Sequence, residues 1–250
     1  MKKTLLALAG ASLLSVSAQA EQFWADNSVS VLYGSDYEFL KDEDLTTMTL
    51  EHVSGHTWGG LFFFVDRHKG AGYSEIYGEV SPNFTLTKMD GMVSAVNLVY
   101  TYEFNNFQTG ARDFDGDDSN NAFHKGFDNH LVGAGVDLKV PGMDFLSVNL
   151  YRALNDAVGG DDNDDNQITV VYGAHFGDII VDGFMDYSFA SEDDNVEDSM
   201  NFTPQITYNL APMLGMKNKL KVGIEYSYWT NQFGGDDDQS AISLLLKAHL

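Results

Sequence analysis

Hydrophobic and polar residues alternate with a period of two along most of the chain. In the segment 168–176, Ile168, Val170 and Tyr172 share one face, and the residues between them share the other. The segment 219–230 keeps the same alternation. This period predicts β-strands. Each face is kept for about ten residues, the length at which a tilted strand crosses a membrane.

The alternation and the turn residues between the alternating segments predict about twelve strands. Their ranges are near 28–37, 45–53, 57–67, 73–84, 92–104, 129–140, 145–154, 167–176, 179–189, 199–210, 219–230 and 240–250. Single-chain bacterial barrels have an even number of strands, and this count agrees.

A soluble β-sandwich would alternate as well, but three features favour a membrane barrel. The strands are longer than the five or six residues usual in soluble sheets. The apolar faces often end in aromatic residues, as in the girdles of outer-membrane barrels. The opposite faces carry Asp182, Asp186 and Glu225, which a sandwich core could not accept but a water-filled interior could. We therefore predict an all-β fold, an antiparallel up-and-down transmembrane β-barrel.

The two ends of the chain fit this class. Residues 1–20 have two lysines, a short apolar run and a final Ala-Gln-Ala, the pattern of a secretory signal peptide cleaved after Ala20. The run is too short for a membrane-anchoring helix. The remaining barrel domain, 21–250, ends inside an amphipathic strand, with Ile242 and Leu244 on its apolar face. We expect it to lie in the bacterial outer membrane.

Acidic stretches recur between the predicted strands. They include "KDED" from Lys41, "GDDSNN" from Gly116, "GGDDNDD" from Gly159, "SEDDNVED" from Ser191 and "GGDDD" from Gly234. All of them fall in odd-numbered connections, whereas the even-numbered ones are mostly short. With both termini in the periplasm, the acidic connections lie on the extracellular rim. The sequence leaves open whether the long connection 105–128 folds into the pore.

Composition excludes several partners and activities. The net charge of −23 argues against nucleic acid and against anionic membrane surfaces as electrostatic partners. The chain has no cysteine, so it has neither a disulfide nor a lipoprotein anchor. The loop from Asp113 begins like an EF-hand but has Gly116 at the fourth position and His124 at the twelfth, which disfavours a calcium site. We predict no metal and no cofactor.

Enzymatic activity is the less favoured reading. "GAGVD" from Gly133 lacks the third glycine and the helix of a dinucleotide site. None of the seven histidines belongs to an HExxH motif. Outer-membrane hydrolases exist, so hydrolysis dependent on a rim histidine such as His124 or His130 stays open, but we assign no catalytic residue.

The inner faces of the predicted strands carry aromatic rings beside carboxylates and amides. Rings can stack on a flat polar solute while the polar groups form hydrogen bonds with it. The alternative is that Phe62 and Phe64, within the apolar run "LFFFV", fill space or face lipid. The predicted pore-lining residues are Glu51, Trp58, Phe62, Phe64, Asp66, Tyr77, Glu79, Asp137, Asn149, Tyr151, Asp182, Asp186 and Glu225.

Three segments together resemble the nucleoside-specific channel-forming (Tsx) family, and especially its OmpK branch of outer-membrane proteins and phage receptors. They are "TLEHVSGHTWGGLFFFVDR", "YGEVSPNF" and "GAGVDLKVPGMDFLSVNLY". The matching positions are Glu51, Trp58, Asp66, Glu79, Pro82, Phe84, Gly133, Gly135, Asp137, Pro141, Ser147, Asn149 and Tyr151. The chain departs from the family's charged residues at Thr49, Gly60, Ser81 and Asn83, and from its tyrosines at Phe62 and Phe64.

The resemblance implies a monomeric twelve-stranded barrel with a narrow, substrate-preferring pore. The leading hypothesis is a channel for passive diffusion of small hydrophilic solutes, with nucleosides as candidates. The alternative is a surface barrel with a closed pore whose loops bind a partner such as a phage. In both cases the barrel wall contacts outer-membrane lipid and lipopolysaccharide.

Overall fold

The computed structural model describes most of the chain after residue 20. The described residues are 21–38, 40, 43–109, 123–156, 164–189, 197–217, 219–232 and 238–250. The predicted signal peptide (1–20) and the central part of the 105–128 connection lie outside them. Half of the stretch "KDED" and most or all of each other acidic stretch also lie outside the described residues.

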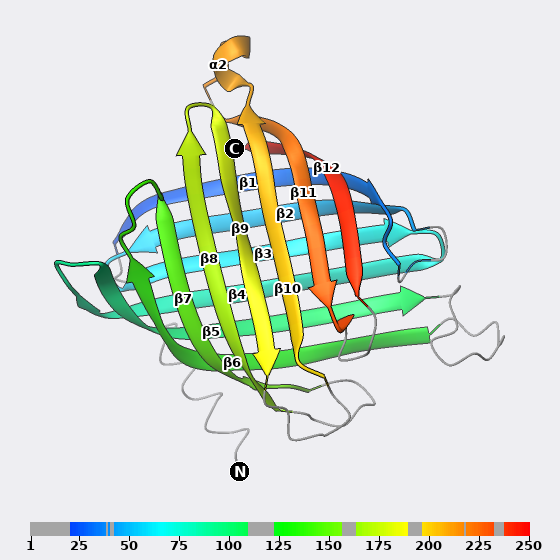
Figure 1. The fold of residues 1–250 in the computed structure, drawn as a ribbon, viewed down its shortest axis with the longest axis horizontal. Helices are drawn as coiled ribbons and strands as arrows, with labels where there is room; N and C mark the ends of the chain where they lie inside the picture. Colours follow the sequence, from blue (N-terminus) through cyan, green and yellow to red (C-terminus); the bar gives the residue numbers. More distant parts are fainter. Residues whose placement is uncertain are drawn as a thin grey trace.

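Twelve antiparallel strands close into one barrel, so the predicted fold class is confirmed (Figure 1). Neighbours in sequence are neighbours in the sheet, and β1 pairs with β12. The strands are β1 (Gln22–Ser35), β2 (Leu45–His56), β3 (Gly59–Gly70), β4 (Tyr73–Lys88), β5 (Val93–Thr109), β6 (Phe123–Leu138), β7 (Phe145–Leu154), β8 (Asp165–Phe176), β9 (Ile179–Phe189), β10 (Ser199–Asn209), β11 (Leu220–Thr230) and β12 (Gln239–His249). In Figure 1 the strands β8 to β11 in front run steeply across β1 to β5 behind, as tilted strands on opposite walls of a barrel do.

The hairpin of β5 and β6 is longer than the sequence predicted. It pairs continuously out to Thr109 and Phe123, well beyond the predicted ends near 104 and 129. The added part of β5 reads Asn105-Asn106-Phe107-Gln108, with polar residues on both faces. Period-two alternation of hydrophobicity cannot mark a strand that has water on both sides.

The outer face of the barrel is apolar and the inner face is largely polar. In β12 the outward Ile242, Leu244 and Leu246 are exposed by about half or more, while Ser243 and Lys247, which alternate with them, are buried. Because successive side chains point to opposite faces, one strand serves both lipid and interior. A closed barrel with an exposed apolar outer surface is the structure of a protein of the bacterial outer membrane.

The two rims differ in their connections. We call the rim where β1 begins and β12 ends the terminal rim, and the other the loop rim. Connections at the terminal rim are two to ten residues long, and the longest contains the short helix α2 (Ala211–Leu214). The strands joined by the acidic stretches all end at the loop rim, which in outer-membrane barrels faces outward. The β3–β4 connection, Ala71–Gly72, is the exception there because it has only two residues.

Among the described residues, no helix combines the length and the apolar character needed to cross a membrane.

Candidate functional site: the barrel interior

Strand register decides the orientation of the apolar run in β3. Phe64 pairs with Glu51 on β2 and with Glu79 on β4. The Glu51 carboxylate contacts Lys247, whose side chain is buried on the inner face of β12. Directly paired residues share a face, so Phe64, and Phe62 two residues before it, point inward. The sequence alone left this orientation open.

Alternation and pairing place all but one of the predicted pore-lining residues on the inner face. The residues so placed are Glu51, Phe62, Phe64, Asp66, Tyr77, Glu79, Asp137, Asn149, Tyr151, Asp182, Asp186 and Glu225. The structure shows which way these side chains point; their role in transport stays a prediction.

Trp58 requires a correction. It lies in the two-residue turn before β3, outside any strand. Its ring stacks on His56 with centroids 4.9 Å apart and packs against Phe84 at 5.1 Å. Both neighbours alternate with the inner-face residues of their strands and so point outward. The even spacing from Trp58 to Phe62 suggested a shared face, but alternation holds only within a strand, and β3 begins at Gly59.

Three carboxyl groups on opposite walls of the barrel point into the interior. Glu79 on β4 and Glu103 on β5 interact electrostatically with each other and with Asp186 on β9. Five positions separate β4 from β9 around the sheet, so the charges face one another across the barrel. We call Glu79, Glu103 and Asp186 the acidic cluster.

Neutral donors hold the acidic cluster in place. The Tyr77 hydroxyl donates to Glu79 at 2.6 Å, and the Asn129 amide donates to Glu103 at 3.1 Å. Asp186 accepts from Thr169 at 2.5 Å and from Gln167 at 3.2 Å. No lysine or arginine among the described residues forms a salt bridge with any of the three. Among the described residues, the acidic cluster is therefore held by neutral donors alone.

A row of aromatic rings borders the acidic cluster. Phe62 and Phe64 are 5.7 Å apart between centroids, Phe64 and Tyr77 are also 5.7 Å apart, and Phe127 on β6 follows at 6.2 Å from Tyr77. Tyr77 belongs to both features, because its ring is in the row while its hydroxyl bonds Glu79. Ring faces next to carboxylates can hold an amphipathic or cationic solute weakly.

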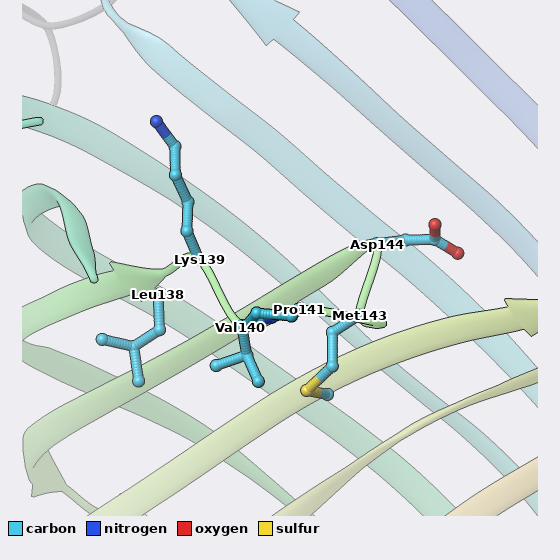
Figure 2. Close-up of a pocket in the computed structure, with 6 residues that line it drawn as sticks. All are labelled: Leu138, Lys139, Val140, Pro141, Met143 and Asp144. Atoms are coloured by element: carbon cyan, nitrogen blue, oxygen red, sulfur yellow. The ribbon is translucent and has the colours of Figure 1, made fainter. Parts of the chain in front are cut away.

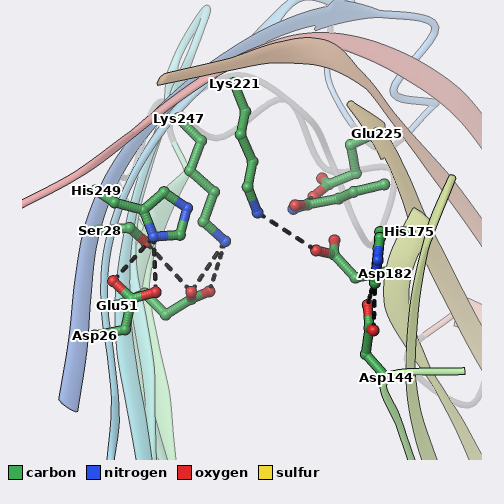
Figure 3. Close-up of polar contacts among 11 residues, drawn as sticks. Asp26, Ser28, Glu51, Asp144, His175, Asp182, Lys221, Glu225, Lys247 and His249 are labelled. Carbon is green, nitrogen blue, oxygen red and sulfur yellow. Dashed lines mark hydrogen bonds and ion pairs between the residues drawn. The ribbon is translucent and has the colours of Figure 1, made fainter. Parts of the chain in front are cut away.

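The inner cations lie elsewhere, toward the terminal rim (Figure 3). Lys247 contacts Glu51 at 2.9 Å, and Lys221 contacts Asp182 at 3.7 Å. His249, two residues after Lys247 on β12, contacts Asp26 at 2.9 Å. The interior is thus divided: the two lysines pair with Glu51 and Asp182, whereas the three acids of the acidic cluster have only neutral hydrogen-bond partners among the described residues.

Asp137 forms hydrogen bonds within the wall. It accepts from the Asn97 amide at 3.0 Å and from the Ser147 hydroxyl at 2.7 Å. These bonds join β5, β6 and β7 near the terminal rim. Asn149 packs against Gly135 of β6. A side chain at position 135 would clash with the amide oxygen of Asn149. Asp137 and Asn149 therefore contact neighbouring strands and stabilise the barrel wall.

The first connection enters the mouth of the barrel at the loop rim. Tyr37 is 6% exposed, and its hydroxyl forms a 2.7 Å hydrogen bond with Ser243 on the inner face of β12. Leu40 is 3% exposed and belongs to the same cluster as Leu45 and Ala241. Burial raises the pKa of Tyr37, so its hydroxyl remains protonated. Tyr37 and Leu40 narrow the mouth of the barrel, and we call these two residues the mouth segment.

Several of these interior residues were not predicted as pore-lining. They are Glu103, Lys221, Lys247, Thr169, Gln167 and Tyr37. Strand alternation from neighbouring predicted positions could have found the strand residues. Alternation could not have identified Tyr37, because side chains in a connecting segment do not alternate between two faces with a fixed period.

Neither a ligand pocket nor a metal site was found elsewhere in the described residues. The turn between β6 and β7 bears a shallow, largely apolar hollow, with Lys139 and Asp144 pointing away from each other (Figure 2). It lacks the converging polar groups of a ligand site. Within the described ranges, no three His, Asp or Glu side chains are grouped closely enough to hold a metal ion.

No protein-family model matches the chain, and no curated protein matches it. Among solved structures, the KdgM porin is similar at 12% identity and a TM-score of 0.46, over 88% of this chain and 98% of that one. OccK11 (OpdR) of Pseudomonas aeruginosa is similar at 7% identity and 0.42, over 93% and 96%. The β domain of the Bordetella autotransporter Brka is similar at 14% and 0.39, over 92% and 99%. Likeness at this level says nothing of solute or activity.

Proposed function

We propose that this barrel is an outer-membrane channel for passive diffusion of small hydrophilic solutes. The observation that carries the proposal is the acidic cluster facing the interior beside the aromatic row. A twelve-stranded barrel is wider than the eight-stranded barrels that side chains fill, yet narrower than open porins. Lining residues in such a barrel can discriminate among solutes.

The interior charges favour neutral and cationic solutes over anions. A carboxylate without a cationic partner repels an anion at short range and is weakly screened where water is scarce. Weak contacts at several positions let a solute enter and leave. Nucleosides fit this preference because they have a flat ring for stacking and a polar sugar, and the sequence resemblance to nucleoside channels supports them as candidates.

A second candidate function is a surface barrel with a closed pore, whose loops bind a partner such as a phage. Two observations favour it. The mouth segment occupies the loop rim, and interior side chains such as Leu131 and Leu245 are 1% and 2% exposed. Under this alternative the acidic stretches at the loop rim would be the functional surface.

Single-channel conductance of the refolded mature protein in a planar bilayer separates the two. A channel gives discrete openings, and adenosine or thymidine blocks them in a saturable way while a sugar does not. Openings without selective block indicate a general small-solute pore. A silent bilayer with correctly folded protein contradicts the channel and favours the loop-binding alternative. Lipid or peptide hydrolysis lost on changing His130 would instead indicate an enzyme.

The charge argument has its own test. We expect the triple variant Glu79→Gln, Glu103→Gln, Asp186→Asn to lower the cation-to-anion permeability ratio by roughly threefold or more, since each carboxylate adds to the local potential. Reversal potentials in a KCl gradient measure this ratio. Asp178→Asn is the matched control, because Asp178 lies in the terminal-rim turn between β8 and β9. An unchanged ratio in the triple variant would remove the acidic cluster from the conduction path.

A further inference from the structure

Two cations lie side by side on the outer face of the barrel. Arg67 and Lys69 alternate with the inner-facing Asp66 and His68 on β3, so they point away from the interior. Arg67 pairs with Met48 on one side and Ile76 on the other, which are 46% and 43% exposed on the same outer face. Cations on a lipid-facing surface are costly unless an anion accompanies them.

Both cations converge on one hydroxyl group. The Arg67 guanidinium donates to the Ser74 Oγ at 2.7 Å, and the Lys69 ammonium donates to the same oxygen at 3.1 Å. The other guanidinium nitrogen donates to the Glu75 carbonyl at 3.0 Å, which fixes the orientation of the group. Two like charges held this close repel each other, and a bound anion would relieve that repulsion.

No carboxylate supplies this anion among the described residues. None of the ion pairs within the described ranges involves Arg67 or Lys69. Asp44, which precedes β2, hydrogen-bonds to the Tyr33 hydroxyl. By contrast, the outward Arg152 on β7 has a carboxylate within 3.5 Å, that of Asp164.

The position of the cations suits the surface of the outer leaflet. Lys69 is the residue before the last of β3, at the loop rim, where the apolar outer surface ends. The β3–β4 connection is only two residues long, so this hairpin brings no long loop of its own over the cations. The exposed amides Asn106 and Gln108 lie on the same outer face of the neighbouring β5.

We propose that Arg67, Lys69 and Ser74 form a binding site for a phosphate of lipopolysaccharide, the phosphorylated glycolipid of the outer leaflet. A guanidinium and an ammonium are the groups that recognise phosphate, and the hydroxyl adds a third donor. The overall charge of −23 does not oppose this, because fields from the acidic loops are screened over about 10 Å. The site serves attachment to lipid and is independent of solute passage.

Titration with purified lipid A tests the proposal. Protein in detergent micelles is titrated with bisphosphorylated lipid A and with the same lipid stripped of its phosphates, and bound lipid is counted by native mass spectrometry. We expect the double variant Arg67→Gln, Lys69→Gln to bind bisphosphorylated lipid A roughly tenfold more weakly than the unmodified chain. The stripped lipid should bind both proteins equally and weakly.

Arg152→Gln is the matched control, because it removes an outward arginine that already has a carboxylate partner. It should leave lipid A affinity unchanged. Gel mobility before and after heating confirms that each variant is folded. The proposal is overturned if the double variant binds normally, or if the stripped lipid binds as well as the phosphorylated one. Equal binding of phosphatidylglycerol would also overturn it, by making the site a general one for anionic lipid.

Discussion

Lys247 and Glu51 form an ion pair in the interior that links the last strand to the second. The nitrogen and oxygen are 2.9 Å apart, and the side chains are 8% and 26% exposed. Glu51 also accepts a hydrogen bond from Ser28 on β1, between the two strands. The pair therefore stabilises the seam at which the barrel closes.

Loss of this cation should destabilise the barrel. We expect Lys247→Met to lower the free energy of unfolding by about 2 kcal/mol, because it leaves a half-buried carboxylate without its cation. Urea unfolding in lipid vesicles, followed by tryptophan fluorescence, measures the change. Lys247→Arg should restore most of the stability. Lys139→Met, at an exposed turn position, should change it by no more than about 0.5 kcal/mol.

At the scale of single strands, Gly78 of β4 shows why a glycine stands in a strand interior. It pairs with Phe104 of β5, whose ring lies where a side chain on Gly78 would be. A side chain there would also meet the Phe64 carbonyl at 2.9 Å. An aromatic ring covering a cross-strand glycine is a known stabilising pair in sheets.

Substitution of Gly78 should therefore be costly. We expect Gly78→Ala to destabilise the barrel by about 1–3 kcal/mol, since the ring or the strand must move. Gly91→Ala, in a turn with only one atom near the added methyl, at 3.8 Å, should have little effect. The same urea titration serves for both. Equal stability of the two variants would mean that β4 adjusts without strain.

The mouth segment makes a separate prediction about conductance. Tyr37→Phe removes the hydroxyl that bonds Ser243 but keeps the ring, so it should cost about 1 kcal/mol in stability and leave conductance almost unchanged. The pair Tyr37→Ala, Leu40→Ala removes the side chains that fill the mouth and should raise single-channel conductance. If the double variant conducts like the original chain, the mouth segment does not limit flow.

For the molecule as a whole, the depth of an outward-facing position in the membrane determines how well it tolerates a charged side chain. Leu244 is 68% exposed on the outer face in the middle of β12, whereas Ser240 lies on the same face near the loop rim. We expect Leu244→Arg to destabilise the barrel by about 2–4 kcal/mol and Ser240→Arg by less than about 1 kcal/mol. Unfolding in bilayers of defined thickness compares them. Equal costs would place the hydrocarbon region elsewhere on the barrel.

The sequence by itself determined the class of fold and the number of strands. Period-two alternation is a property of neighbouring residues, so β7 and β9 were predicted with the bounds that the structure has. Inner-facing acids such as Asp186 followed from the same alternation. Trp58 was misplaced because alternation was carried across the start of a strand into a turn.

Tertiary structure decided everything that depends on distance across the barrel. Only closure brings Asp186 opposite Glu79 and Glu103, and only the fold of the first connection brings Tyr37 to Ser243. Glu51 and Lys247 are 196 residues apart in sequence and in contact in space. Local periodicity gives the face on which a residue lies, but its partner on another wall depends on strand register and barrel closure, which no local pattern records.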